Sequence, residues 1–291
     1  MYPKLTPRDI QGILSVYQCR YLTGSQLQRL HFPSQQVMWR RLQSLLEMGF
    51  IKSFTAPHIP ERIFYLDKKG AEIVAIELHI PYEDLEWYPH TRAPKDYYFL
   101  RHFLAINDFR ITLTLACLKS TIALIDFIPE YVGEKTGEGH VKKYIRSKVN
   151  DIALSAVSYS HTPDAVFSLE KDGKAALFFL EIDRGGEVLT DSQKGFLKCV
   201  VFYLNLWSGT VWKRYEKDFG REFNAFRVLI VTTSQERLKH MREAVSAYPF
   251  PQNHAKRFLW GTIQPHVSVD WLFESIWHSM DATDTTAYRI G

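Results

Sequence analysis

Residues 163–185 read PDAVFSLEKDGKAALFFLEIDRG, two apolar runs joined by Asp172-Gly173. An Asp-Gly pair between apolar runs is a strong signal for a two-residue β-hairpin turn. If the hairpin closes at this turn, its register places Asp164 directly opposite Glu181, with the two side chains on the same face. The sequence therefore predicts two carboxylates that meet at one end of an apolar strand pair.

Asp183 lies two residues beyond Glu181 and shares its face of the strand. Because like charges placed opposite each other destabilise a sheet, we expect an Mg²⁺ or Mn²⁺ ion bound by Asp164, Glu181 and Asp183. The alternatives are protonation of one acid, or pairing of the acids with Arg184 or Lys194. A register slip of one residue would send Asp164 to the other face.

A metal ion at this position would favour phosphodiester hydrolysis, because it polarises a phosphoryl oxygen and lowers the pKa of an attacking water. The capping-box pair Thr190 and Gln193 predicts that a helix begins at residue 190. Lys194 and Lys198 lie one turn apart on this helix, so one of them could reach the site as an assisting cation. The alternative for both lysines is an ordinary solvated helix face.

Apolar periodicity predicts helices and strands on both sides of the hairpin. The predicted helices cover residues 96–119, 190–204, 235–247 and 270–277, and the predicted strands cover residues 122–128, 165–169, 175–182, 227–233 and 258–262. The core order is helix, three strands, helix, strand around a mixed central sheet. Residues from 281 onward are polar, and we expect them to form a loose tail.

Residues 131–161 are long for a loop between strands, and they are basic at Lys142, Lys143, Arg146 and Lys148. Long loops in compact domains are often functional. We therefore expect this segment to contact DNA, as a second site in addition to the N-terminal residues described next. The alternative is a disordered surface insertion.

The first 80 residues predict a separate small domain. Thr6, Thr23 and Ser34 stand at N-cap positions of three short amphipathic helices. Two β-like runs at residues 50–55 and 62–67 then form a hairpin. Three helices followed by a hairpin is the plan of a winged helix-turn-helix.

The outward face of the third helix and the hairpin carry side chains suited to DNA, because Gln and Arg can read base edges and Arg can hold phosphate. The candidate DNA-binding residues are Gln35, Gln36, Trp39, Arg40, Arg41, Gln43, Lys52 and Arg62. The alternative is a winged helix that contacts another protein.

Charge is unevenly distributed along the 291 residues. Residues 1–70 hold ten basic and four acidic side chains, an excess of six positive charges, whereas the whole chain has a net charge of +4. A basic module joined to a slightly acidic body suits a nucleic-acid reader, although charge alone fits a solvated surface equally well.

Other sequence features exclude several classes of protein. Cys19, Cys117 and Cys199 are far apart, which predicts small core residues rather than disulfides or a zinc module. The N-terminus does not read as a signal peptide, and the apolar runs are too short or too interrupted to span a membrane. We expect a cytoplasmic protein associated with the nucleoid or a plasmid.

Two resemblances follow from these segments. The N-terminal winged helix, HFLAINDFR at residues 102–110 and residues 163–185 resemble the plasmid replication-relaxation proteins. The element order and the PD…ExD pattern of the second domain resemble the PD-(D/E)xK nucleases, which have a restriction-endonuclease-like fold.

The nuclease resemblance implies roles for particular residues. The Asp after Pro and the third-strand acid of that superfamily bind the metal, and they match Asp164 and Glu181. An acid of the first helix often joins them, a place that Asp108 could fill. The third-strand lysine is replaced by Asp183, and Lys194 on the next helix is the candidate substitute.

The expected protein is α+β or α/β, with a winged helix at 1–80, a linker at 81–96, a nuclease-like α-β-β-β-α-β domain at 97–280 and a tail at 281–291.

The resemblance to the replication-relaxation proteins implies a role in replication or mobilisation of plasmids or integrated elements. One hypothesis is a metal-dependent endonuclease or nickase. The alternatives are a non-catalytic replication or transcription factor, and an adaptor for a separate replication enzyme. Expected partners are double-stranded DNA, replication or mobilisation proteins and a second copy in a homodimer, with no membrane.

Overall fold

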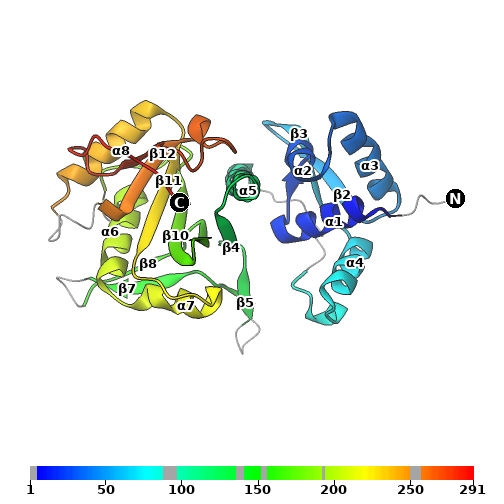
Figure 1. The fold of residues 1–291 in the computed structure, drawn as a ribbon, viewed down its shortest axis with the longest axis horizontal. Helices are drawn as coiled ribbons and strands as arrows, with labels where there is room; N and C mark the ends of the chain where they lie inside the picture. Colours follow the sequence, from blue (N-terminus) through cyan, green and yellow to red (C-terminus); the bar gives the residue numbers. More distant parts are fainter. Residues whose placement is uncertain (1–4, 88–96, 136–140, 152–155, 192–193, 250–256) are drawn as a thin grey trace. The chain divides into compact units, whose positions relative to one another are not determined.

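The computed structural model describes the chain except residues 1–4, 88–96, 136–140, 152–155, 192–193 and 250–256. The chain forms two compact units, Met1–Ile111 and Thr112–Gly291 (Figure 1). The division falls within one long helix, α5 (Tyr97–Leu118).

The N-terminal unit begins with three helices and then a hairpin, in the predicted order. Its elements are α1 (Pro7–Cys19), β1 (Leu22–Thr23), α2 (Gly24–His31), α3 (Gln35–Glu47), β2 (Ile51–Ala56), β3 (Ile59–Leu66), α4 (Lys68–Leu78) and η1 (Tyr82–Asp84). Capping boxes at Thr6 and Thr23 start α1 and α2, and the Ser34 side chain caps α3, as predicted. The strands form a three-stranded sheet in the order β1-β3-β2.

Apolar side chains of these elements form the core of the N-terminal unit. Ile13 of α1, Leu27 of α2 and Phe64 of β3 are fully buried. The first half of α5 belongs to the same unit, where the Asn107 amide donates to the carbonyls of Cys19 and Tyr21 at 2.9 and 2.8 Å. This buried amide is therefore satisfied by backbone acceptors.

The C-terminal unit is built on a mixed sheet. Its strands are β4 (Ala123–Pro129), β5 (Gly133–Lys135), β6 (Val141–Lys143), β7 (Ser147–Asn150), β8 (Ser158–His161), β9 (Ala165–Lys171), β10 (Lys174–Ile182), β11 (Phe226–Thr232), β12 (Leu259–Ile263), β13 (Trp277–Ser279) and β14 (Ala287–Tyr288). Its further helices are α6 (Gly195–Ser208), η2 (Val211–Lys213), α7 (Arg214–Phe219), α8 (Gln235–Ala247) and η4 (Gln264–His266).

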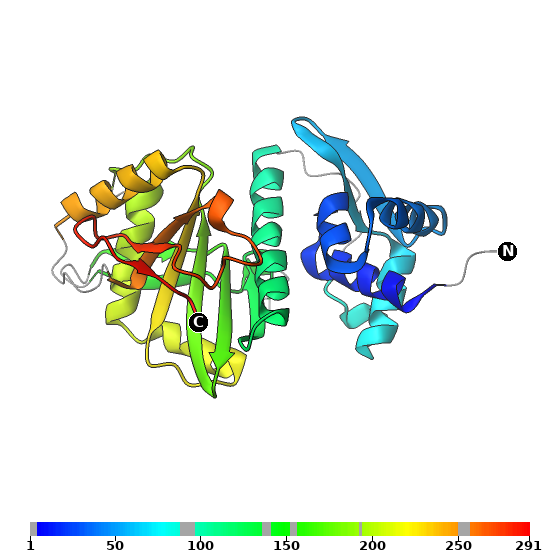
Figure 2. The same cartoon turned by 45° about the horizontal axis from the view of Figure 1, so that its top comes forward.

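Seven of these strands form one sheet in the order β14-β13-β12-β11-β10-β9-β4. Strands β4, β9 and β10 are successively antiparallel, whereas β10, β11 and β12 are parallel. Helices α6 and α8 lie on the same side of this sheet (Figure 2). The overall class is thus α+β with a mixed central sheet, as predicted.

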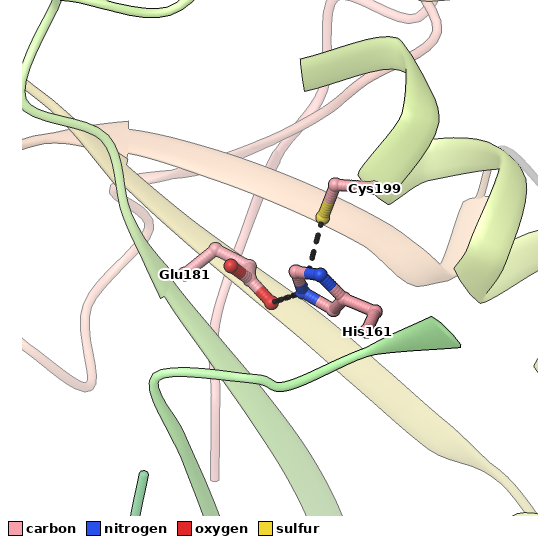
Figure 3. Close-up of side chains that lie close together, drawn as sticks. All are labelled: His161, Glu181 and Cys199. Atoms are coloured by element: carbon pink, nitrogen blue, oxygen red, sulfur yellow. Dashed lines mark hydrogen bonds and ion pairs between the residues drawn. The ribbon is translucent and has the colours of Figure 1, made fainter. Parts of the chain in front are cut away.

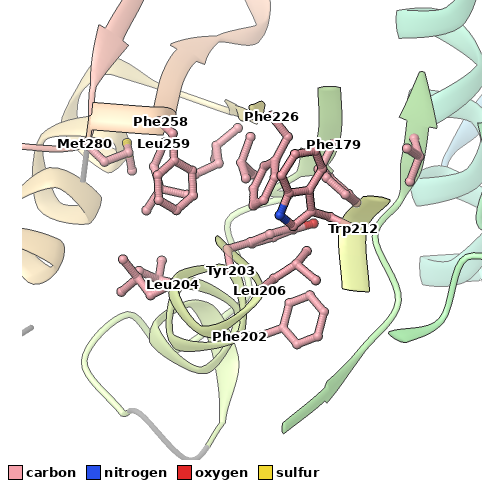
Figure 4. Packing of buried hydrophobic residues seen from close by; sticks show 14 of the residues in the cluster. Phe179, Phe202, Tyr203, Leu204, Leu206, Trp212, Phe226, Phe258, Leu259 and Met280 are labelled. Carbon is pink, nitrogen blue, oxygen red and sulfur yellow. The ribbon is translucent and has the colours of Figure 1, made fainter. Parts of the chain in front are cut away.

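The core of the C-terminal unit lies between the sheet and its helices and is rich in aromatic side chains (Figure 4). Phe179 of β10 packs edge-on against Phe226 of β11 and Tyr203 of α6, with ring centroids 4.9 and 5.5 Å apart. This packing fixes which face of α6 points at the sheet.

Two predicted segments differ in the structure. The described parts of residues 131–161 hold two antiparallel strand pairs, β5 with β6 and β7 with β8, where a long loop was predicted. Residues 270–277 form turns that lead into β13 instead of a helix, because Leu272 and Trp277 are both fully buried and the Trp277 ring N–H donates to the Leu272 carbonyl.

The predicted loose tail from residue 281 is instead packed. Strand β14 pairs with β13, and Ile290 is 1% exposed. The Arg242 guanidinium donates to the carbonyls of Ser279, Asp281 and Asp284, which anchors the start of this segment. Polar composition was misleading here because backbone acceptors and one apolar residue hold the segment.

Within the described parts of the chain, no helix has the length and apolar character needed to cross a membrane.

Candidate functional site

The β9–β10 hairpin places the predicted acids at one end of the sheet. Asp172 and Gly173 have φ of 50° and 71°, which is the geometry of a two-residue hairpin turn. The predicted register holds from this turn to the last strand pair, Ala165 with Leu180. The next residue, Asp164, accepts a hydrogen bond from the Ile182 N–H at 2.6 Å through Oδ2. Its carboxylate thus lies beside the end of β10.

Glu181 faces α6 and β8 rather than open solvent. Its Oε1 lies 2.7 Å from Nε2 of His161 at the end of β8, and it accepts a hydrogen bond from the Tyr203 hydroxyl at 2.5 Å. The Cys199 thiol of α6 lies 3.6 Å from the same Nε2 (Figure 3). The side chains of His161 and Glu181 are 24% and 16% exposed, so the cluster is only partly buried.

The cluster carries excess negative charge. Burial and the neighbouring Asp164 raise the pKa of Glu181, against the lowering effect of His161. Burial alone would lower the pKa of His161, but Glu181, Asp164 and Glu187 raise it overall. Burial and these same carboxylates raise the pKa of the Cys199 thiol well above its ordinary range. A cation at this place would offset the repulsion.

Asp183 has a different partner from the one predicted. Its carboxylate accepts hydrogen bonds from Arg237 in the first turn of α8, at 2.9 and 3.0 Å, and from the Thr232 hydroxyl at 2.5 Å. Burial would raise the pKa of Asp183, but these hydrogen bonds lower it overall. Its negative charge is therefore compensated by Arg237.

The two other predicted site residues also have partners of their own. Lys194 is exposed at the start of α6, with its Nζ 3.5 Å from Asp191. Helix α6 begins at Gly195 rather than at Thr190, and Gln193 of the predicted capping box lies outside the described residues. Asp108 forms an ion pair with Arg29 at 2.5 Å within the N-terminal unit.

Helix α3 exposes most of the predicted DNA-binding side chains. Met38, Leu42 and Leu45 are buried, and the exposed residues on the remaining surface include Gln35, Gln36, Trp39, Arg40 and Gln43. Arg41 instead forms an ion pair with Asp9, a side chain with no exposed surface. On the hairpin, Arg62 is exposed, and Lys52 is exposed but lies 3.0 Å from Asp67.

The basic residues of 131–161 lie on or beside the two small strand pairs. Lys143 forms an ion pair with Glu130, and Arg146 donates to the Ser160 hydroxyl at 3.0 Å. Lys148 is exposed, and the Lys142 side chain lies outside the described residues.

Comparison with protein families decides the relationship of the chain. A model of the replication-relaxation family matches residues 14–221, which is more than half of the sequence. The chain belongs to the replication-relaxation family. Comparison with curated proteins and with solved structures found no match. Membership of the replication-relaxation family indicates a role in plasmid replication or mobilisation.

The residues that complete the cluster in this replication-relaxation protein were not predicted from the sequence. Cys199 was interpreted as a core residue, and His161 and Tyr203 were not singled out. The available signal was the position of His161 two residues before Pro163, beside the predicted acid. Arg237 could not be found without knowing how α8 packs.

Proposed function

We propose that this replication-relaxation protein binds double-stranded DNA through its N-terminal unit, as a winged helix-turn-helix. The supporting observation is the exposed polar face of α3, together with the β2–β3 hairpin that follows it. Helices of this kind enter the major groove, and a hairpin wing contacts the backbone beside it.

The side chains on α3 divide into two chemical roles. Gln35, Gln36 and Gln43 offer amides that can pair with base edges, and amide pairs of this kind discriminate adenine from other bases. Arg40 is exposed on the same helix, and Arg62 is exposed on the hairpin. Both arginines are suited to phosphate, and their contacts would position the protein without reading sequence.

The test compares two double substitutions of equal charge in the full chain. Arg40→Gln with Arg62→Gln removes two charges from the proposed surface. Lys171→Gln with Lys174→Gln removes two charges from the exposed β9–β10 turn.

We expect the arginine variant to bind duplex DNA at least about tenfold more weakly, because each charge-assisted hydrogen bond contributes about 1.5–3 kcal/mol. The lysine variant should retain wild-type affinity in the same gel-shift titration. Equal affinities of the two variants would exclude DNA binding by this face.

A second candidate function is phosphodiester hydrolysis by the C-terminal unit. The favouring observation is the sheet order β4-β9-β10-β11 with α6 between β10 and β11, together with Asp164 beside the end of β10 that carries Glu181. This arrangement supports the resemblance to the PD-(D/E)xK nucleases. The position of the motif lysine is occupied by Asp183, whose charge is paired with Arg237.

The donor set does not fit the predicted Mg²⁺ ion held by three carboxylates. Asp183 is used by Arg237, and a nitrogen and a sulfur atom face Glu181 instead. Magnesium prefers oxygen ligands in octahedral geometry. This donor set therefore gives no support to a hydrolytic step assisted by a magnesium ion.

Cleavage is tested on supercoiled plasmid with Mg²⁺ or Mn²⁺, at protein concentrations that retard the same plasmid in a gel. Nicked or linear product from the wild type and from Asp270→Asn, an exposed acid elsewhere, but not from Asp164→Asn would support the nuclease or nickase. Retarded plasmid without cleavage would favour the non-catalytic replication factor or adaptor.

A further inference from the structure

We propose that His161, Glu181 and Cys199 together bind a divalent cation of the zinc class, through one nitrogen, one oxygen and one sulfur atom. The three side chains come from β8, β10 and α6 and point toward one another (Figure 3). One possible ligand atom of each lies within 4.8 Å of the other two.

His161 Nε2 is close to one atom of each of the other two side chains. Nε2 lies 2.7 Å from the Glu181 carboxylate and 3.6 Å from the Cys199 sulfur. A ring nitrogen has one in-plane position, which holds either a hydrogen that donates or a lone pair that accepts. Protons can link the three side chains, because the Cys199 thiol also hydrogen-bonds to Glu181. A metal ion would replace these protons, since metal ligands must be deprotonated.

A metal ion at this position would bond to all three atoms at once. In a tetrahedral zinc site, the ordinary bond lengths place sulfur about 3.6 Å from nitrogen and oxygen about 3.3 Å from nitrogen. The Cys199–His161 distance of 3.6 Å already has this value. The Glu181–His161 distance needs to widen by about 0.6 Å from its 2.7 Å, a small rotation of the Glu181 side chain.

The surroundings hold the ligands in place. The Tyr203 hydroxyl donates to the Glu181 oxygen that also faces His161, so it orients this carboxylate in the way outer-shell partners orient metal ligands. The His161 ring packs against Phe202 and Tyr203, with centroids 5.2 and 5.6 Å away. Because the three ligands lie on regular elements, the strands β8 and β10 and the helix α6, the site is largely preformed.

The chemistry of the donors selects the metal. Thiolate and imidazole ligands favour zinc and similar transition metals over magnesium and calcium. Three protein ligands leave the fourth tetrahedral position for water or a substrate atom, as in catalytic zinc sites.

The test uses the full chain, stripped with a chelator and titrated with Co²⁺ alone, which reports thiolate ligation by a charge-transfer band. We expect one Co²⁺ per chain with this band, displaced by Zn²⁺ and not by Mg²⁺. Cys199→Ser should abolish the band. His161→Gln should weaken binding by at least about tenfold, since even outer-shell substitutions cost about 10–100-fold.

Cys117→Ser is the matched control, because Cys117 is a partly buried thiol elsewhere in the same unit, and it should leave the spectrum unchanged. Cooperative melting of each variant verifies its fold. A spectrum without a thiolate band, or one that is the same in Cys199→Ser, would overturn the proposal. Zinc binding without plasmid cleavage would support this site and count against the nuclease, so the two ideas fail separately.

Discussion

Two neighbouring arginines of α3 have opposite environments, and the sequence alone does not distinguish them. Arg40 is exposed, whereas Arg41 forms an ion pair with Asp9, whose pKa is lowered by this contact despite the opposing effect of burial. Removing one partner of a buried ion pair leaves an uncompensated charge in the interior.

We therefore predict that Arg41→Gln destabilises the N-terminal unit by about 3–5 kcal/mol. Arg40→Gln should change the free energy of unfolding by less than about 0.5 kcal/mol, as exposed substitutions do. Urea denaturation of both variants measures the difference. Equal midpoints would show that the Asp9 contact does not contribute to folding.

The ion pair of Asp183 with Arg237 allows a second test on single residues. Its carboxylate is stabilised in the folded state by Arg237 and Thr232, so its pKa is below that of the unfolded chain. A carboxylate with a lowered pKa stabilises the folded state at pH values above its pKa in the unfolded chain, which is about 3.9. This stabilisation is lost as the pH falls through the lower pKa of the folded state.

Asp183→Asn should accordingly lower stability at pH 7 by about 1.5–3 kcal/mol, the range for hydrogen bonds to charged groups. As pH falls from about 4 through the lowered pKa of the folded state, the difference in stability from wild type should narrow, because the wild-type carboxyl becomes protonated. Thermal melting from pH 3 to 7 measures this difference, with Asp270→Asn as the exposed control. A difference in melting temperature between Asp183→Asn and wild type that stays constant from pH 3 to 7 would exclude the ion pair as the cause of the destabilisation.

At the scale of elements, the β9–β10 turn sets the register that brings Asp164 beside the end of β10. Gly173 has φ of +71°, and a Cβ added there would meet no atom within 4 Å. Any cost of a side chain at this position is therefore backbone strain alone.

We predict that Gly173→Ala destabilises the C-terminal unit by about 1–2 kcal/mol, the cost of the left-handed region for an L-residue. Gly186→Ala is the control, because it also meets open space but has φ outside that region. Chemical denaturation should show a lower midpoint for Gly173→Ala alone. Unchanged midpoints for both would mean that the turn does not require a left-handed backbone.

Elements with strong local signals were predicted well from the sequence. The Asp172-Gly173 turn gave the hairpin register, and N-cap residues gave the starts of α1, α2 and α3. The start of α6 was misplaced because Gly195, with φ of +69° close to the Val188 carbonyl, lets the chain turn just before the helix. Local capping residues at 190–193 carry no information about that tertiary contact.

The candidate site was predicted in part for the same reason. Strand register follows from a turn and from alternation, so the relation of Asp164 to Glu181 could be read from the sequence. The partners of Glu181 and Asp183 come from α6, α8 and β8, and their approach depends on how helices pack on the sheet. Periodicity identifies the buried face of a helix, but it does not say which strand residue that face meets.

For the whole molecule, the decisive feature is the separation of charge between the two ends of the chain. Residues 1–70 hold the excess of six positive charges that the rest partly cancels. Several of these cations are used inside the N-terminal unit, since Arg41 pairs with Asp9, Lys52 with Asp67 and Arg29 with Asp108. Asp9 and Asp67 are already among the four acids subtracted, so only the pair with Asp108 lowers the excess, from six charges to five.

We predict a moderate salt dependence of DNA binding by the full chain. The logarithm of the affinity should fall linearly with the logarithm of salt concentration, with a slope of about −0.9 for each phosphate neutralised. Arg40→Gln should reduce the magnitude of this slope by about 1, whereas Arg41→Gln, whose guanidinium already faces Asp9, should leave it unchanged in folded protein. Fluorescence anisotropy with a labelled duplex at several salt concentrations gives both slopes. If Arg41→Gln reduced the slope as much as Arg40→Gln, the Asp9 ion pair would have to open on DNA, and the assignment of α3 surface residues would need to include Arg41.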